Sequence, residues 1–326
     1  MSNDKPKVAF YWCASCGGCE EAVVDLAEDI LKVTAAVDIV FWPVALDFKR
    51  KDVEAMEDGS IAVSFINGAV RLSEQEEMVK LLRQKSGLVV AFGSCSHLGG
   101  IPGLGNFWNK KTIFEYAYLK SPSTDNPEKI VPLEKYDLDG KELELPRFYD
   151  TVYALDQVID VDYYLPGCAP PKDLILNAVN AILEGKLPPK GSVLSPNKSL
   201  CEDCERNDSK PENLTIKEIK RPSGVEMDPE ECFLAQGIIC MGPATRTGCG
   251  ERCIIGNMPC RGCFGPTDQV HDQGAKFLSA LASILETDDE KEIEKLVETI
   301  VDPAGTFYRF SLPTSILRRK KMEAIK

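Results

Sequence analysis

The chain has 326 residues, 44% of them hydrophobic, so it is long enough to bury a full core and to divide into two domains. Its formal net charge of −13 gives no electrostatic support for binding nucleic acid or an anionic membrane surface. No stretch approaches the roughly 18 apolar residues of a membrane span, and the opening residues MSNDKPKVAF contain no apolar signal segment. We therefore expect a cytoplasmic protein without a membrane span.

The first 190 residues alternate between strand and helix patterns. Short apolar, β-branched runs predict strands, and the amphipathic stretches between them predict helices. The expected strands are residues 7–12, 37–44, 60–66, 87–92 and 158–165, and the expected helices are residues 19–33, 73–85 and 171–184. Ser73 would cap the second of these helices, with Glu76 completing a capping box. The alternation predicts an α/β fold, a doubly wound parallel sheet with helices on both faces.

Two regions depart from this alternation. Residues 119–147 are rich in proline and charge and show no periodicity, so we interpret them as an inserted surface excursion. After Lys186 the chain becomes rich in proline, glycine, cysteine and charge, with helical patterns only at residues 273–285 and 290–300. We place a domain boundary near residue 190, which gives a sheet domain at residues 1–190 and a loop-rich domain at residues 191–326.

Thirteen cysteines are the most informative feature of the sequence. Eight of them lie in the loop-rich region as two sets of four, with a close pair at the start and another at the end. They are Cys201, Cys204, Cys232, Cys240, Cys249, Cys253, Cys260 and Cys263. Sets of four thiolates hold iron–sulfur cubanes or structural zinc.

Two other interpretations of these cysteines compete with iron–sulfur clusters. A disulfide framework is typical of short secreted chains without a large core, which does not describe this chain. A zinc ribbon could join the first and last Cys-x-x-Cys pairs, but the roughly 55 residues between them exceed the usual spacing and four cysteines would be left over. A mononuclear zinc site also stays open for the N-terminal cysteines. Analysis for iron and acid-labile sulfide separates these alternatives.

The other cysteines follow predicted strands. Cys13, Cys16 and Cys19 come after the first strand, Cys95 after the strand ending at residue 92, and Cys168 after the strand ending at residue 165. Because the carboxyl ends of parallel strands form the ligand crevice of an open α/β sheet, these cysteines can converge on one site. Glycines flank them and let backbone N–H groups approach closely, whereas the first turn lacks the dinucleotide fingerprint G-x-G-x-x-G. The pattern predicts a metal cluster where a flavodoxin-like fold holds its cofactor.

Thirteen cysteines give three sets of four and one spare thiol. The spacing of Cys13, Cys16 and Cys19 copies the start of a bacterial ferredoxin run, but no fourth cysteine follows at the expected position. We take Cys13 as the spare, because it follows Trp12 while the strand is still running. A lone buried cysteine acts as a small hydrophobic residue.

Five motifs, in sequence order, resemble the small, electron-transferring subunit of [NiFe] hydrogenases. They are CGGCEE at residues 16–21, GSCSHLGGIPG at 93–103, PGCAPP at 166–171, CFLAQGIICMGPATRTGCG at 232–250 and MPCRGCFGP at 258–266. The resemblance covers nearly the whole chain. The closing stretch DPAGTFYRFSLP at residues 302–313 resembles the cytoplasmic methyl-viologen-reducing type, whose small subunit is joined to heterodisulfide-reductase machinery.

The resemblance implies three [4Fe-4S] clusters. Cys16, Cys19, Cys95 and Cys168 would bind the proximal cluster, beside the nickel–iron site of the large subunit. Cys249, Cys253, Cys260 and Cys263 would bind the medial cluster, and Cys201, Cys204, Cys232 and Cys240 the distal one. Glu21 matches an acidic residue that lies near the subunit interface in the family and is linked there to proton movement. As an ordinary acid at a helix start it would contribute under about 1 kcal/mol.

Two positions depart from the periplasmic members of the family. Cys253 stands where those proteins commonly have proline and a three-iron cluster, and Cys201 stands where they have histidine. The two histidines of the chain, His97 and His271, occupy neither position. Thiolate ligation at all three sites favours low and similar reduction potentials.

The resemblance implies an oxidoreductase subunit without catalytic residues of its own. It would relay electrons from dihydrogen oxidation at the large subunit to a downstream iron–sulfur or flavoprotein acceptor, such as a heterodisulfide-reductase complex. Two other functions stay open, a quinone-linked respiratory iron–sulfur subunit and a free-standing multicluster ferredoxin. The sequence CGGC at residues 16–19 argues against the first, since those chains usually have adjacent cysteines there and lack the C-terminal cysteine block. Co-purification with a nickel protein distinguishes the second.

Overall fold

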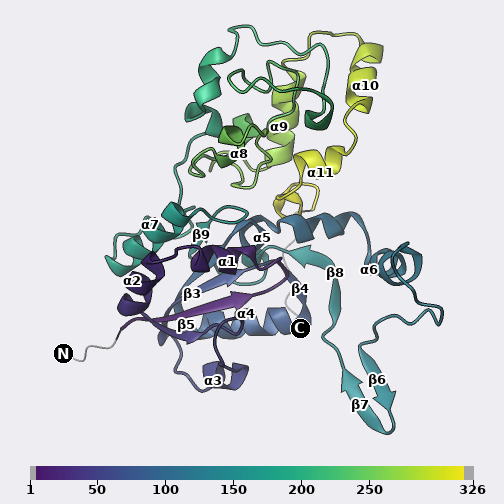
Figure 1. The fold of residues 1–326 in the computed structure, drawn as a ribbon. Helices are drawn as coiled ribbons and strands as arrows, with labels where there is room; N and C mark the ends of the chain where they lie inside the picture. Colours follow the sequence, from purple (N-terminus) through teal and green to yellow (C-terminus); the bar gives the residue numbers. More distant parts are fainter. Residues whose placement is uncertain (1–4, 319–326) are drawn as a thin grey trace.

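Five parallel strands form the central sheet of the computed structural model, which describes residues 5–318. The strand order is β2-β1-β3-β5-β9 (Figure 1). The strands are β1 (Lys7–Trp12), β2 (Asp38–Phe41), β3 (Ile61–Asn67), β5 (Ser86–Phe92) and β9 (Tyr163–Leu165). The first strand lies inside the sheet and the second at its edge, which is the order of a flavodoxin-like, doubly wound fold. The predicted α/β class is confirmed.

Helices cover both faces of this sheet because its strands carry apolar side chains on both sides. Along β1, Val8 and Phe10 pack into one buried cluster, and Ala9 packs into the other. The first face is covered by α1 (Gly18–Val24), α2 (Asp29–Ala36) and α7 (Lys172–Leu183), and the second by α3 (Arg50–Glu54) and α4 (Ser73–Lys85). The short helix α5 (Ser94–Leu98) follows β5 directly, at the carboxyl edge of the sheet.

Several predicted elements differ in extent from the observed ones. Residues 19–33 do not form one helix, because Ala27, between α1 and α2, has a φ of 54°. This left-handed conformation interrupts an α-helix. The predicted strand at residues 37–44 is reduced to β2. The predicted strand at residues 158–165 is reduced to β9, because only Tyr163–Leu165 pair with β5 and the 3₁₀-helix η3 (Leu155–Gln157) precedes them.

The predicted capping box at the start of α4 is wrong. Ser73 is the first helical residue, and its Oγ accepts a hydrogen bond from the backbone N–H of Arg147 (3.0 Å). Gln75 supplies the cap instead, since its Oε1 accepts from the backbone N–H of the residue before the helix (3.0 Å). Glu76 forms an ion pair with Lys80 on the next turn. The helix bounds were therefore predicted correctly, but the capping residue was not.

The region at residues 119–147 lies on the surface, as predicted, but contains more regular structure than its composition indicated. α6 (Lys110–Glu115) and a π-helical turn, η2 (Tyr116–Lys120), lead into it, and β6 (Lys135–Leu138) pairs with β7 (Lys141–Glu144) as a hairpin. Asp139 and Gly140 both have positive φ (54° and 80°), as a two-residue type I′ turn requires. The hairpin is exposed throughout and projects away from the body (Figure 1). A second antiparallel pair, β4 (Val70–Leu72) with β8 (Phe148–Tyr153), was also missed.

Loops and short helices make up residues 191–318, which confirms the loop-rich character predicted for this region. The longer helices are α9 (Gln273–Ala282) and α10 (Glu290–Glu298), within the two stretches predicted as helical, and the shorter ones are α8 (Arg252–Ile255) and α11 (Pro303–Phe307). The 3₁₀ turns are η4 (Leu200–Glu202), η5 (Glu205–Ser209), η6 (Pro222–Gly224), η7 (Gly242–Ala244) and η8 (Leu312–Thr314). Phe233 and Phe277 belong to the separate buried cluster that holds this region together. None of the helices within residues 5–318 has the length and apolar character needed to span a membrane.

The end of the described chain returns to the carboxyl edge of the sheet. The backbone N–H of Gly100 donates to the carbonyl of Phe310 (2.9 Å), and Nε2 of Gln157 donates to the carbonyl of Pro313 (2.9 Å). The 3₁₀-helix η1 (Ile101–Phe107) lies at this contact. The loop-rich region is therefore joined to the sheet region beside the helix that carries Cys95.

Candidate metal centres

Four cysteines meet at the carboxyl edge of the sheet. Cys16 lies in the loop after β1, Cys19 on α1, Cys95 on α5 and Cys168 in the loop after β9. Burial is the main cause that raises the pKa of the Cys19 thiol, and the thiols of the other three cysteines raise it further. Burial likewise raises the pKa of Cys95 to about 12, with Cys168 and Cys16 adding to the shift. The four sulfur atoms therefore lie within electrostatic reach of one another, as the strand-end argument predicts.

Glycines leave room for sulfur atoms at this edge. A Cβ built on Gly93 would lie 2.3 Å from Sγ of Cys19, and one built on Gly100 would lie 2.5 Å from Sγ of Cys95. Both glycines have positive φ (85° and 56°), so backbone conformation and close approach both require glycine. Four thiols beside bare backbone fit an iron–sulfur cluster, which is held by cysteine sulfur and suits concave arrays of backbone N–H groups.

Cys13 lies on the other face of the sheet. It is 5% exposed and packs in the same buried cluster as Ala9, whereas Cys19 packs in the cluster that contains Phe10. Along β1, residues two apart point to the same face, so Cys13 continues the face of Ala9, whereas Cys19 lies on α1, which covers the other face. Burial raises the pKa of the Cys13 thiol, with no other cysteine adding to the shift among the described residues. These are the surroundings of a small core residue.

The two glutamates of CGGCEE have different surroundings. Glu21 is exposed on α1, whereas Glu20 is only 4% exposed. Oε2 of Glu20 accepts a hydrogen bond from Nε1 of Trp42 (2.9 Å), and Oε1 accepts one from Nδ2 of Asn67 (2.9 Å). Burial raises the pKa of the Glu20 carboxyl, and the two hydrogen bonds oppose that shift. Sequence reasoning selected Glu21 and missed Glu20, although helical spacing places Glu20 on the same buried face as Val23.

A second set of cysteines lies among the C-terminal loops. Its members line a cavity of about 40 Å³ that is otherwise largely apolar, with Leu200 and Phe233 in its wall. Burial, then the thiol of Cys240 and, to a smaller extent, those of Cys204 and Cys232 together raise the pKa of Cys201 to about 12. The structure thus brings together Cys201, Cys204, Cys232 and Cys240, which were predicted for the distal cluster.

A third set lies between the other two. Burial raises the pKa of Cys263 to about 12, and Cys168, Cys249 and Cys253 add to the shift. Cys249 packs against the buried cluster of the sheet and also against that of the C-terminal region. Cys260 is buried between the second and third sets, since the thiols that raise its pKa after burial are those of Cys240 and Cys263. The four cysteines predicted for the medial cluster are therefore neighbours.

The donor chemistry of the three sets is the same. Each offers four cysteine sulfurs, the ligands of a [4Fe-4S] cluster, and none of the thirteen cysteines is paired in a disulfide. Within residues 5–318, no three His, Cys, Asp or Glu side chains gather closely enough to hold a single metal ion. Neither histidine joins a set. His97 packs against the ring of Tyr164 (4.7 Å between centroids), and burial lowers its pKa to about 3, while His271 is exposed.

Sequence reasoning also missed a buried arginine that supports the third set. Arg246 is 1% exposed, and its guanidinium forms an ion pair with Asp268. The same group donates to the carbonyls of Ser195, Pro196 and Pro266 at 3.2–3.3 Å. These bonds tie the segment before Cys249 to the chain that links the two regions. The surrounding sequence TRTG contains no pattern from which a buried arginine could be predicted.

The sheet topology and the three cysteine sets define an α/β protein built to hold iron–sulfur clusters. Residues 16–182 match the family described as NADH ubiquinone oxidoreductase, 20 Kd subunit. The matched region begins at Cys16 and ends within α7, so it contains all four cysteines of the first set.

Relatives over the full length define the family more narrowly. The chain is 43% identical to the iron–sulfur subunit of the F420-non-reducing hydrogenase of Archaeoglobus profundus, covering 96% of this chain and 98% of the relative. It is 37% identical to a subunit of the F420-non-reducing hydrogenase of Methanothermobacter thermautotrophicus, covering 97% of each. A chain of the recombinant [NiFeSe] hydrogenase structure from Desulfovibrio vulgaris Hildenborough shares the fold, with a TM-score of 0.51 at 19% identity over 81% of this chain and 95% of that one.

The chain belongs to this family of F420-non-reducing hydrogenase iron–sulfur subunits. It is thus a subunit of an oxidoreductase complex. The resemblance to the small subunit of the methyl-viologen-reducing type of hydrogenase is confirmed.

Proposed function

We propose that this chain is the electron-transfer subunit of a cytoplasmic [NiFe] hydrogenase and that it holds three [4Fe-4S] clusters. The proximal ligands are Cys16, Cys19, Cys95 and Cys168, the medial ligands are Cys249, Cys253, Cys260 and Cys263, and the distal ligands are Cys201, Cys204, Cys232 and Cys240. A bound cluster accepts and releases one electron at a time. The chain makes no bond to substrate, and its part is to fix the order and the surroundings of the clusters.

The observation that carries this proposal is the order in which the three sets follow one another. Oγ of Ser94, which adjoins Cys95 of the proximal set, donates a hydrogen bond to the backbone carbonyl of Cys263, in the medial set. The backbone N–H of Cys260, also in the medial set, donates to Sγ of Cys240 in the distal set (3.3 Å). Neighbouring sets therefore touch, and this contact supports a path for electrons from the sheet edge into the C-terminal region.

Exposed apolar side chains beside the proximal set support a partner at the sheet edge. Trp12 is 37% exposed, and Ile101, which follows Gly100, is 46% exposed. The ring of Trp12 lies over Gly17 in the loop of Cys16, where a Cβ would come within 3.1 Å of it. An exposed apolar patch of this kind is typical of a protein interface. We infer that the [NiFe] large subunit covers this surface, which would bring its metal site next to the proximal cluster.

The acceptor lies at the opposite end of the series in this proposal. We infer that the distal set delivers electrons to an iron–sulfur or flavoprotein partner such as a heterodisulfide-reductase complex. Cys201 and Cys253 support a low-potential acceptor, because they complete thiolate ligation at the distal and medial sites.

The C-terminal cluster domain begins near residue 190, after α7. The many free thiols support the cytoplasm as the compartment.

Purification of the tagged chain from cells that make the natural complex tests the proposal. We expect a nickel-containing large subunit to co-purify, and we expect iron and acid-labile sulfide in roughly equal amounts, as cubane clusters require. A chain that purifies alone with a full complement of iron would be a free-standing ferredoxin. Zinc in place of iron would contradict the assignment of all three sets.

A further inference from the structure

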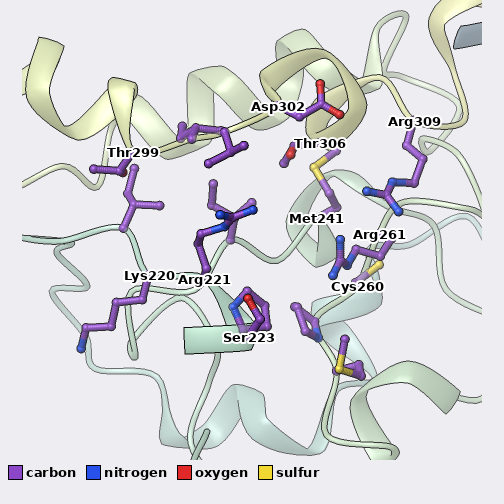
Figure 2. A pocket seen from close by; sticks show the side chains of 17 residues that line it. Lys220, Arg221, Ser223, Met241, Cys260, Arg261, Thr299, Asp302, Thr306 and Arg309 are labelled. Carbon is purple, nitrogen blue, oxygen red and sulfur yellow. The ribbon is translucent and has the colours of Figure 1, made fainter. Parts of the chain in front are cut away.

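A basic pocket of about 430 Å³ lies beside the medial and distal cysteine sets. Its walls come from four separate segments: the turn around η6, the stretch with Ile239 and Met241, the loop that carries Cys260, and the stretch from the end of α10 to Arg309 (Figure 2). Four cationic residues, Lys220, Arg221, Arg261 and Arg309, line it together with one carboxylate, Asp302. Such a concentration of positive charge is unexpected in a chain with a net charge of −13.

Three guanidinium groups converge in this pocket. Figure 2 shows Arg261 and Arg309 pointing toward each other and Arg221 reaching in from the opposite side, whereas the ammonium group of Lys220 lies apart. The like charges of the Arg261 and Arg309 guanidinium groups repel each other, and an anion bound between them would replace this repulsion with attraction.

The chain does not neutralise these groups itself. Within residues 5–318, none of the three arginines forms an ion pair, and Nε of Arg309 donates to the backbone carbonyl of Gly305 (3.0 Å). The Asp302 carboxylate is turned away from the guanidinium groups in Figure 2 and accepts a hydrogen bond from the backbone N–H of Gly305 (2.9 Å). Asp302 thereby caps α11, so the one carboxylate of the pocket is engaged elsewhere.

We propose that this pocket binds an oxyanion, a phosphate or carboxylate group held by Arg221, Arg261 and Arg309. The planar fork of a guanidinium binds either group through two parallel hydrogen bonds. The remaining wall is largely apolar and includes Ile239 and Met258, so an anionic group attached to a small apolar body fits. A volume of about 430 Å³ lies within the range of small-ligand sites.

Charge compensation of a neighbouring cluster is a simpler role for Arg261, which directly follows Cys260. It does not account for Arg221 or Arg309, which come from the segments of η6 and α11 and also point into the pocket (Figure 2). The inference does not depend on the proposed electron-transfer function, because the pocket is built by side chains of this chain alone.

Binding of inorganic pyrophosphate tests the pocket. Isothermal titration calorimetry at low ionic strength would be carried out on the full iron-loaded chain and on the hydrogenase complex. Arg221→Gln and Arg309→Gln should each weaken binding about tenfold or more, because each removes a charge-assisted hydrogen bond. Lys276→Gln is the matched control, since it removes one positive charge from an exposed position on α9 outside the pocket. Neither arginine adjoins a cysteine, so iron content should stay at the wild-type level.

Two results support the site and identify the source of the anion. Binding to both the full chain and the complex would indicate a small soluble oxyanion, whereas binding to the full chain alone would indicate that carboxylates of a partner subunit fill the pocket in the complex. Absence of binding to either preparation would overturn the proposal. So would an affinity that both arginine variants leave unchanged, or one that Lys276→Gln weakens equally.

Discussion

Substitution of Gly93 by alanine places a side chain where the sulfur of a proximal ligand lies. Gly93 has a φ of 85° and a ψ of 166°, a region restricted essentially to glycine that costs other residues on the order of 1–3 kcal/mol. The new Cβ would lie 2.3 Å from Sγ of Cys19, whereas non-bonded heavy atoms settle at about 3.5–4.0 Å. The sulfur would have to move by more than about 1 Å, and functional sites tolerate displacements of about 0.5 Å. We expect the proximal cluster to be lost while the chain still folds.

Gly185→Ala separates the collision from the backbone strain. Gly185 also has a positive φ, of 66°, but a Cβ built there meets no atom within 4 Å. Both substitutions carry a backbone cost, which is about 1–2 kcal/mol for a left-handed residue. Only Gly93→Ala adds a contact with a cluster ligand, so the two variants should differ in cluster content and not merely in stability.

The assay combines iron and acid-labile sulfide per chain with electron paramagnetic resonance of the dithionite-reduced protein. Gly93→Ala should lose the iron and the signal of one cluster, and in the complex it should lose dihydrogen-dependent dye reduction. Gly185→Ala should keep its iron content, its cluster signals and its dihydrogen-dependent dye reduction. If Gly93→Ala retained its full iron content and every cluster signal, the steric reasoning and the assignment of Cys19 to the proximal cluster would both be refuted.

Four further substitutions test three separate features. Cys13→Ser should leave iron content and electron transfer unchanged, because this thiol packs on the other face of the sheet. Cys16→Ser should disrupt the proximal cluster. The reverse result would mean that the wrong thiol was taken as the ligand. Cys253→Pro should convert the medial cluster to a three-iron form of higher potential, detected by paramagnetic resonance of the oxidised protein, and three intact cubes would require a new grouping of the eight C-terminal cysteines. Asp162→Asn should destabilise the fold by about 2 kcal/mol at neutral pH, because it breaks ion pairs with Arg83 and Lys190. Burial raises the pKa of the Asp162 carboxyl, but hydrogen bonds from these two cations lower it below its usual value. The stabilisation is therefore present above about pH 4 and is lost as the pH falls below it. Urea titrations in which the free energy of unfolding differs between variant and wild type by the same amount above and below about pH 4 would contradict this.

The proximal set is the part of the site that follows most directly from the sequence. Cys16, Cys95 and Cys168 each follow a strand of a parallel sheet, and topology alone brings the carboxyl ends of such strands to one edge. The placement of Cys13 on the face of Ala9 also follows from elementary geometry, because the pleat of β1 sends every second side chain to the same face. Neither inference needs a long-range contact to be known.

Other features depend on contacts that sequence distance hides. Trp42 and Asn67 bury Glu20 from two other segments of the chain, whereas the family resemblance pointed to its exposed neighbour Glu21. Ala27 interrupts the first helix although it has the highest helix propensity of any residue, because the tertiary fold overrides local preference there. The three arginines of the basic pocket are spread over nearly 90 residues, and no spacing rule joins them.

Exposure to dihydrogen tests the central claim most directly. The isolated chain with its clusters assembled and the complex with the large subunit would each be placed under dihydrogen, and the absorbance and paramagnetic signals of the clusters would be followed. We expect dihydrogen to reduce the clusters of the complex and to leave those of the isolated chain oxidised, although dithionite reduces both. Reduction of the isolated chain by dihydrogen, or clusters in an active complex that never become reduced, would contradict the assignment of this chain as the electron-transfer subunit.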